Sequence, residues 1–305
     1  MSETGTPITV IDTHLAGRER LTACYLLLGE RPAIIDPGAE TSTQTVVDAL
    51  GAAGLGPDDL AWIVLTHIHL DHCGATGGIA AAFPKATVVV HPRGARHLAE
   101  PDRLVAATAA VHGPRASLYG GLRPTAPERI TVAEDGHMVD LGGGRRLEMF
   151  ETVGHARHHM AVHDEATDSV FAGDAVGVTF PGGGPYPAMP PSDIDLEGWR
   201  HSLDRISDRR PRALYPTHFG PVPDPQQTIA TVREQLATTA RAARAAWRGG
   251  GGVSAVAEAL DHDLPLAPAV RDPAALAQWE FIGWREANPD GVAAWARSRE
   301  ERDES

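Results

Sequence analysis

The stretch 61–72, Ala-Trp-Ile-Val-Leu-Thr-His-Ile-His-Leu-Asp-His, joins a short apolar run to four potential metal ligands. The apolar run is typical of a buried strand, and the polar residues follow it directly. His67 and His69 are two positions apart, so an extended backbone points both imidazoles to the same side. Asp71 and His72 follow as the chain turns, where they can face a second ion. The stretch therefore predicts a metal site at the edge of a sheet.

The residue types narrow the kind of metal site. Imidazole and carboxylate groups suit zinc, iron or manganese. A structural zinc site would usually contain cysteine ligands and close at four of them. Here the cysteines are Cys24 and Cys73, far from any C-x-x-C spacing. The pattern therefore favours a site that leaves one position open for water, and the separated cysteines indicate free thiols in a reducing, cytoplasmic compartment.

The run 67–72 resembles the HxHxDH signature of the metallo-β-lactamase-fold hydrolases. Four further stretches resemble the other motifs of that family, in the expected order. Each ends an apolar run before a turn, and together they cover about residues 20 to 222. They are Ala-Ile-Ile-Asp-Pro-Gly with Asp36, Thr-Val-Gly-His with His155, Phe-Ala-Gly-Asp with Asp174, and Pro-Thr-His-Phe-Gly with His218.

The resemblance implies two divalent ions, with zinc expected and iron or manganese as alternatives. One ion would be held by His67, His69 and His155, and the other by Asp71, His72 and His218, with Asp174 between them. Asp36 and His159 would hydrogen-bond to the ligand groups instead of binding an ion. Two such ions lower the pKa of a bridging water and supply a hydroxide. Asp71 is also the catalytic candidate, placed to hydrogen-bond that hydroxide and relay its proton.

The charge and composition of the chain limit the kinds of molecule that it is expected to bind. The 305 residues carry a formal net charge of −13, which argues against a general nucleic-acid or anionic-membrane surface. No N-terminal stretch joins a basic start to an apolar core, and no apolar run approaches the length that spans a bilayer. We therefore expect a cytoplasmic protein that acts on a small molecule. A helical tail with tryptophans is a surface that a homodimer could use.

Strands alternating with helices in two halves predict an α+β protein with a four-layer αβ/βα sandwich, as in the resembled family. The helix-rich segment 225–305 is expected to be an appendage to a catalytic domain of residues 1–224. The Gly- and Pro-rich segment 175–192 follows Asp174 and is expected to form a rim of the site. Four side chains in loops are candidates for substrate binding, namely Tyr119, Phe180, Tyr186 and Met189.

The function we expect is hydrolysis of a thioester, lactone or related ester. The ligand pattern resembles that of glyoxalase II, which also has a helical tail, but the tail here does not match the glutathione-binding residues of that enzyme. Two alternatives stay open. The same metal pair can hydrolyse phosphodiesters, as in ribonuclease-type relatives. Persulfide dioxygenases keep a similar motif and use a single iron.

Overall fold

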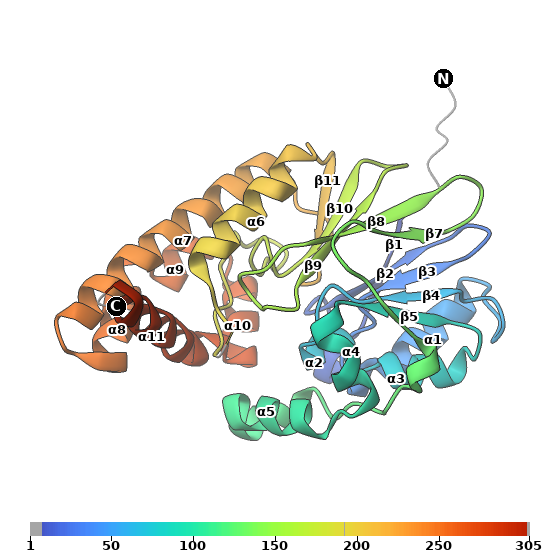
Figure 1. Cartoon of the computed structure of the whole chain (residues 1–305), viewed down its shortest axis with the longest axis horizontal. Coiled ribbons are helices and arrows are strands. Elements are labelled where there is room, and N and C mark those ends of the chain that lie inside the picture. The colour runs from blue at the N-terminus through green and yellow to red at the C-terminus, as the bar shows by residue number, and fades with distance from the viewer. Residues whose placement is uncertain (1–7, 192, 304–305) are drawn as a thin grey trace.

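Two β-sheets pack face to face, with helices on the outer face of each, in a computed structural model of the chain (Figure 1). The structure describes residues 8–191 and 193–303, except the side chains of 267–268 and 284–286. The layers run helices, sheet, sheet, helices. This is the predicted four-layer sandwich, and the fold prediction is confirmed.

The first sheet is built by the N-terminal half of the chain and has the strand order β1-β2-β3-β4-β5-β6. Its first three strands pair antiparallel, and β3 to β6 pair parallel. The parallel strands therefore all end at one edge of the sheet. Their bounds are Ile8–Asp12, Ala23–Leu27, Ala33–Ile35, Trp62–Val64, Thr87–Val90 and Ile130–Val132.

The second sheet has the order β11-β10-β9-β8-β7. Neighbours pair antiparallel except for β10 and β11, so β8, β10 and β11 run in one direction. From β7 to β11 the bounds are His137–Asp140, Arg146–Glu151, Met160–Asp164, Ser169–Gly173 and Ala213–Pro216. We did not predict β7, a short strand with only one buried residue.

The central strands, such as β2, β3 and β10, are buried on both faces, which explains why they read as nearly continuous apolar runs. In β2, Ala23, Tyr25 and Leu27 face the second sheet, while Cys24 and Leu26 face the outer helices. The alternation follows from the two-residue period of an extended chain. The space between the sheets is filled from both sides, by residues that include Val64 and Val89 of the first sheet and Met149, Val162 and Phe171 of the second.

The helices form the outer layers. On the first sheet lie α1 (Thr43–Ala52), α3 (Thr76–Ala82) and α4 (Pro92–Ala99), with α2 (Leu70–Cys73) and α5 (Asp102–His112) nearby. Short 3₁₀ turns η1 to η4 cover Leu15–Gly17, Glu40–Ser42, Gly113–Leu118 and Pro127–Arg129. On the second sheet lie α6 (Leu196–Asp208) and α7 (Pro225–Arg248), whose apolar side chains join one cluster with β8 to β11.

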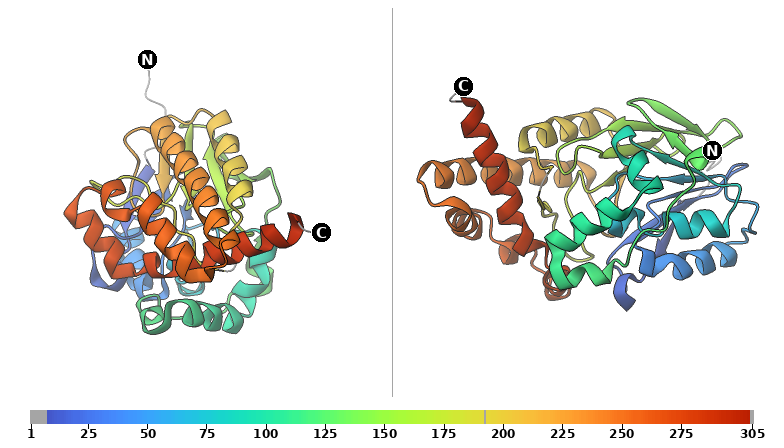
Figure 2. Two further views of the ribbon diagram at one scale, coloured as in Figure 1. Left: turned by 90° about the vertical axis from the view of Figure 1, so that its left-hand side faces the viewer. Right: turned by 60° about the horizontal axis from the view of Figure 1, so that its bottom comes forward.

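The C-terminal helices follow α7 at one end of the sandwich. They are α8 (Gly252–Asp263), α9 (Leu266–Ala269), α10 (Pro273–Ile282) and α11 (Trp284–Asp303). Helix α11 lies against both α7 and α8 (Figure 2). The sequence pattern predicts helices over 273–286 and 289–302, but the break between the last two helices lies at Gly283, which has φ +68° and ends α10 in a left-handed conformation.

The start of α7 is determined by a capping aspartate and a proline in the first turn. Asp224 Oδ1 accepts a hydrogen bond from the Gln227 backbone N–H, and Pro225 occupies the first turn of α7. The predicted boundary at residue 224 coincides with this start, but the division into two domains stays a prediction. In the described part of the chain, no helix has the length and apolarity needed to cross a membrane.

Candidate metal centre

All seven predicted ligands lie at one edge of the sandwich, where strands of both sheets end. The chain leaves β4 of the first sheet just before His67, and α2 then carries two further ligands. Strands β8, β10 and β11 of the second sheet run in one direction and end just before the other three. Ligand sites of open α/β sheets lie at such carboxyl ends. The order along the chain is His67, His69, Asp71, His72, His155, Asp174 and His218.

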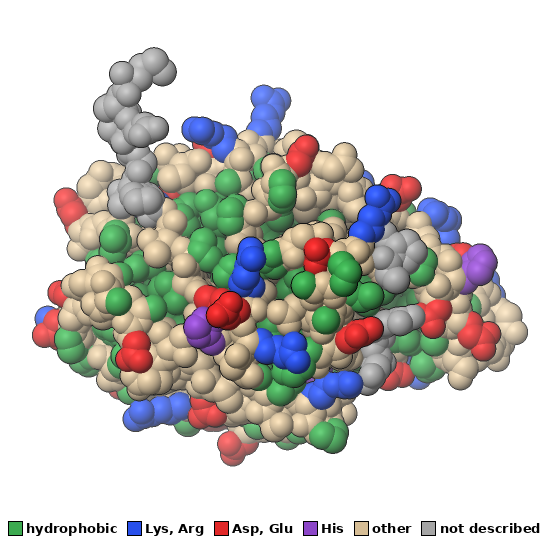
Figure 3. Space-filling view, turned by 180° about the vertical axis from the view of Figure 1, so that it is seen from behind, with side chains coloured by type: hydrophobic (Ala, Val, Ile, Leu, Met, Phe, Trp, Pro, Cys, Tyr) green, Lys and Arg blue, Asp and Glu red, His purple; other side chains and the backbone are tan. Residues whose placement is uncertain are grey.

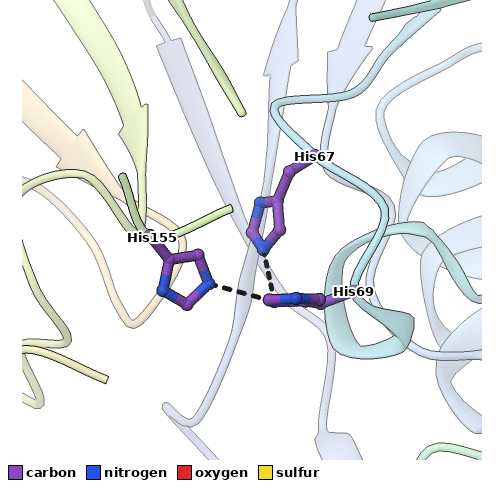
Figure 4. A group of neighbouring side chains, drawn as sticks. All are labelled: His67, His69 and His155. Atoms are coloured by element: carbon purple, nitrogen blue, oxygen red, sulfur yellow. Dashed lines mark hydrogen bonds between the residues drawn. The ribbon is translucent and has the colours of Figure 1, made fainter. Parts of the chain in front are cut away.

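Three histidines converge on one point between the sheets (Figure 4). The Nδ1 atom of His69 lies 3.0 Å from His67 Nε2 and 3.0 Å from His155 Nε2. His67 and His155 are almost fully buried. The three ring nitrogens therefore face one another at a separation that suits shared ligation of one ion.

The hydrogen bonds of the Nδ1 atoms of His155 and His67, which face away from His69, show which ring nitrogen carries the proton. The Ala188 carbonyl oxygen only accepts, so His155 Nδ1 donates to it at 2.8 Å and Nε2 carries a lone pair. Thr66 Oγ1 lies 3.1 Å from His67 Nδ1 and can accept from it in the same way. Both Nε2 lone pairs then point at His69 Nδ1. One proton on that nitrogen can satisfy only one of them, whereas a metal ion satisfies all three.

A second cluster lies beside the first and contains Asp71, His72 and His218. His218 Nε2 is 3.4 Å from Asp71 Oδ2, and His72 Nε2 is 3.8 Å from the same oxygen. His218 Nδ1 donates to the Leu21 carbonyl at 2.9 Å, and His72 Nδ1 lies 3.1 Å from Asp36 Oδ2. Both imidazoles are thus held from behind, with Nε2 facing the carboxylate.

Asp174 lies between the two clusters. Its Oδ2 is 3.4 Å from His155 Nε2, and its Oδ1 is 3.5 Å from His72 Nε2 and 3.7 Å from His218 Nε2. One oxygen therefore faces each cluster. Asp174 therefore lies between the two sets of predicted ligands, and its bridging of two ions stays a prediction.

The buried polar atoms of the centre fit cations. Asp71 Oδ2, His72 Nε2 and Asp174 Oδ1 are buried, and none has a hydrogen-bond partner among the residues that the structure describes. Each such group costs about 1–3 kcal/mol when left unsatisfied. Three of them facing one point is an arrangement that one or two divalent ions would stabilise. Imidazole and carboxylate donors suit zinc, iron and manganese equally.

The charge states agree with ligation by the first cluster. Burial lowers the pKa of His67 and of His69 well below the ordinary imidazole value, and neighbouring imidazoles lower it further. Both are therefore neutral and able to donate a lone pair. Burial also lowers the pKa of His72, but Asp174 and Asp71 outweigh it, with help from Asp36, and raise it to about 9. A metal ion must displace that proton.

Asp36, predicted to orient a ligand, is completely buried and accepts hydrogen bonds from three directions. Oδ1 accepts from the Thr66 backbone N–H at 2.8 Å. Oδ2 accepts from the Thr66 and Thr217 hydroxyls at 2.7 Å each, besides its contact with His72. The carboxylate therefore ties together the segments that carry His67, His72 and His218. Sequence analysis did not single out either threonine, although each directly precedes a predicted ligand.

His159 holds the segment of Asp174. Its Nδ1 lies 2.8 Å from Thr152 Oγ1, and its Nε2 accepts from the Asp174 backbone N–H at 3.1 Å. Gly173 makes this approach possible. It has φ +50°, and a Cβ added there would lie 2.6 Å from His159 Nε2 and 2.7 Å from Thr66 Oγ1. A side chain at position 173 would therefore push apart the groups that place Asp174.

A cavity of about 150 Å³ opens onto the clusters. Of the four side chains proposed to bind substrate, only Tyr119 lines it. Phe180 lies edge-on to His218 at 6.0 Å between ring centres but lines other pockets. Tyr186 packs on Trp279 and donates to the Leu264 carbonyl, and Met189 is buried in the cluster of the second sheet. The segment 175–192 still contributes a rim, through Ala188, Pro190 and Pro191.

His158 lies at the site although the sequence motifs do not identify it, and its sequence context is that of an ordinary strand or loop residue. It lines the cavity, and its ring stacks on that of His67 at 6.1 Å between centres. Burial, with His155 nearby, lowers the pKa of His158 to about 3, so it is a neutral neighbour of the first cluster. Its position three residues after His155 in a dense histidine run was the signal that could have identified it.

Comparisons with known proteins agree with this geometry. A family model described as the metallo-beta-lactamase superfamily matches residues 17–218. The metallo-beta-lactamase fold-containing protein ST1585 of Sulfurisphaera tokodaii is 32% identical to this chain over 205 residues, which is 66% of this chain and 73% of that protein. The probable metallo-hydrolase MJ0888 of Methanocaldococcus jannaschii is 28% identical over 64% of this chain and 85% of its own length.

Solved structures show the same likeness. The crystal structure of ST1585 has a TM-score of 0.65 at 29% identity and covers 75% of this chain and 85% of its own. That of TTHA1429 from Thermus thermophilus has a TM-score of 0.62 at 24% identity, with 91% of this chain and 89% of its own covered, and shows the fold alone. With the family model covering most of the chain, and with its motifs gathered at one buried centre, the protein belongs to the metallo-beta-lactamase superfamily.

Proposed function

We propose that the protein is a metal-dependent hydrolase of a thioester, lactone or related ester, with two divalent ions in its centre. The observation that carries the proposal is the pair of buried clusters joined by Asp174, beside a cavity large enough for the reactive end of a small molecule. Two ions so placed would lower the pKa of water and polarise a carbonyl oxygen. A nucleophilic serine or cysteine is then not required.

The chain's own groups would position the reactants. Burial raises the pKa of Asp71, but His72 and His218 outweigh it and hold this pKa below the ordinary carboxyl range. Asp71 therefore stays ionised where it lines the cavity, and its carboxylate can accept a proton from an attacking water. The hydrogen bonds of His155 and His218 to backbone carbonyls keep both rings oriented during turnover.

Similarity to named proteins supports the hydrolase class. MJ0888 is described as a probable metallo-hydrolase. A shorter match, 39% identical over 59 residues, joins this chain to the N-acyl homoserine lactonase AttM of Agrobacterium fabrum, over 19% of this chain and 21% of that enzyme. The lactonase match favours a cyclic or linear ester among the candidate bonds.

Charge argues against a nucleic-acid substrate. The chain carries a formal net charge of −13. On the face shown in Figure 3, basic side chains are scattered among acidic ones and do not form a stripe. A nucleic acid would need a basic surface to neutralise its phosphates. We therefore place phosphodiester hydrolysis second to ester hydrolysis.

Elemental analysis followed by a substrate panel tests the proposal. Purified protein is analysed for zinc, iron and manganese, and then assayed with thioesters, lactones and bis-(p-nitrophenyl) phosphate. We expect two ions per chain and chelator-sensitive turnover of an ester. One iron per chain with oxygen uptake would instead identify a dioxygenase. Turnover of the phosphate diester alone would move the assignment to phosphodiesters.

A further inference from the structure

Helix α5 has a largely apolar face that the protein buries only in part, with Leu104 at its edge packed against the core. Leu104, Ala107, Thr108, Val111 and His112 follow the spacing i, i+3, i+4, i+7, i+8, so they lie on one face of the helix. An amphipathic helix usually packs such a face on the core. Here no side chain of α5 is buried, and the helix lies beneath α2 and α4, away from both sheets (Figure 1).

The same face forms one wall of the cavity at the metal centre. All five of its residues line the cavity. The wall also includes Tyr119, a buried side chain whose ring lies edge-on to that of His112 at 5.3 Å between centres. Other lining residues are predicted ligands, among them His69, Asp71, His155 and Asp174. The cavity therefore has a ligand-bearing side and an apolar side that faces it.

The size and chemistry of the apolar side restrict what fits. The volume of about 150 Å³ equals that of an engineered apolar cavity that holds benzene. Leu70, Ala188, Pro190 and Pro191 extend the apolar surface beside α5. Among the described residues that line the cavity, none is a lysine or arginine. A carboxylate or phosphate seated against this wall would lose water without gaining a cation.

We propose that the α5 face, Leu104, Ala107, Thr108, Val111 and His112, selects the acyl group of the substrate. With the reacting carbonyl at the ligands, a compact uncharged acyl group lies against this face. The inference rests on the proposed ester hydrolysis and deepens it. Substrates would be thioesters or esters with an acyl group from about butyryl to benzoyl, while succinyl and longer chains would be poor.

Two alanines of α5 offer a matched pair of variants. Ala107→Leu adds bulk to the wall, whereas Ala109→Leu makes the same change two residues later, about 200° around the helix, at an exposed position that does not line the cavity. The zinc-loaded full chain is assayed with acetyl, butyryl, benzoyl and succinyl thioesters of one thiol. Metal content and thermal unfolding are measured for each variant.

For the unaltered protein, kcat/KM is expected to rise about fourfold per added methylene up to butyryl, the fold-change that corresponds to ~0.8 kcal/mol per buried CH₂. Ala107→Leu should lower the ratio of benzoyl to acetyl turnover at least tenfold, and Ala109→Leu should leave it unchanged. Leu104→Ala, which removes a wall side chain, should reduce the preference for butyryl over acetyl. Equal ratios in the two leucine variants, or succinyl turned over as well as butyryl, would overturn the proposal.

Binding separates this inference from the proposed function. Butyrate, benzoate and succinate are titrated into the zinc-loaded protein and both leucine variants by calorimetry. If butyrate and benzoate bind more tightly than succinate, and only Ala107→Leu weakens their binding, the result supports acyl selection by the α5 face even if no ester is hydrolysed. Ester hydrolysis combined with no preference among the three acids refutes the wall and leaves the hydrolase standing.

Discussion

Replacing Asp36 by Asn removes one charge from the centre and leaves the shape of the side chain intact. Asp36 has φ +49°, a left-handed conformation that Asn tolerates as well, so the change isolates the hydrogen bonds from backbone strain. Its carboxylate accepts from the Thr66 N–H, the Thr66 hydroxyl, the Thr217 hydroxyl and His72 Nδ1. An amide has only one acceptor oxygen and cannot serve all four donors.

The cost follows from those contacts. If the Asn oxygen keeps the place of Oδ2, its NH₂ group faces the Thr66 N–H, and that donor is left unsatisfied at about 1–3 kcal/mol. The other three hydrogen bonds change from a charged to a neutral acceptor, each weaker by about 1 kcal/mol. We therefore expect the free energy of unfolding of the metal-free protein to fall by about 4–6 kcal/mol. Looser placement of His72 should weaken zinc binding about 10- to 100-fold.

Urea unfolding of the metal-free protein and zinc titration against a competing chelator measure both effects. Asp58→Asn is the matched control, because the Asp58 side chain is 64% exposed and its Oδ1 lies 3.5 Å from Lys85 Nζ at the surface. It should change neither quantity measurably. An Asp36→Asn protein with the stability and zinc affinity of the unaltered chain would refute the role assigned to this carboxylate.

Further predictions concern the predicted metal ligands, the glycines Gly173 and Gly51, and the protonation of His72. His67→Ala and Asp174→Ala should each abolish stoichiometric metal binding and turnover together while circular dichroism stays native, and metal-independent turnover in either variant would contradict the assignment. Gly173→Ala should lower metal affinity and cost about 1–3 kcal/mol of stability, because the residue has φ +50° and no room for a Cβ. Gly51→Ala, where nothing lies within 4 Å, should gain about 0.5–1 kcal/mol in the same unfolding assay. In the metal-free protein, the pKa of His72 is raised from 6.5 to about 9, so its stabilising contribution is complete below pH 6.5 and is lost as the pH rises through 9. Because zinc displaces that proton, apparent zinc affinity should fall up to ~tenfold for each pH unit below 9, and a flat profile in calorimetry would contradict this charge state.

The ligand set was predicted from the resemblance of five short motifs to those of a known family, and local sequence explains why those motifs lie where they do. Each predicted ligand follows an apolar run, and such a run becomes a buried strand whose end must lie at a sheet edge. The order of the motifs then placed His67, Asp174 and His218 at one end of two sheets. The strands of both sheets were read from the same apolar runs, whereas β7, half-exposed and short, lacked that signal.

Contacts across the cavity could not be predicted in this way. Tyr119, Phe180, Tyr186 and Met189 all looked alike as apolar residues in loops, yet only Tyr119 lines the cavity. Nothing near His112 in the sequence marked it, and it faces the centre because α5 turns its apolar side there.

Sequence alone indicated the fold class and, through the resemblance of its motifs to a known family, the chemical groups of the centre, since strand patterns and short motifs are local properties of the chain. Only the tertiary structure decided the size of the cavity and the identity of its apolar wall. The physical reason is that a helix's periodicity determines which side chains share a face, whereas the paths of the loops on either side determine what that face meets.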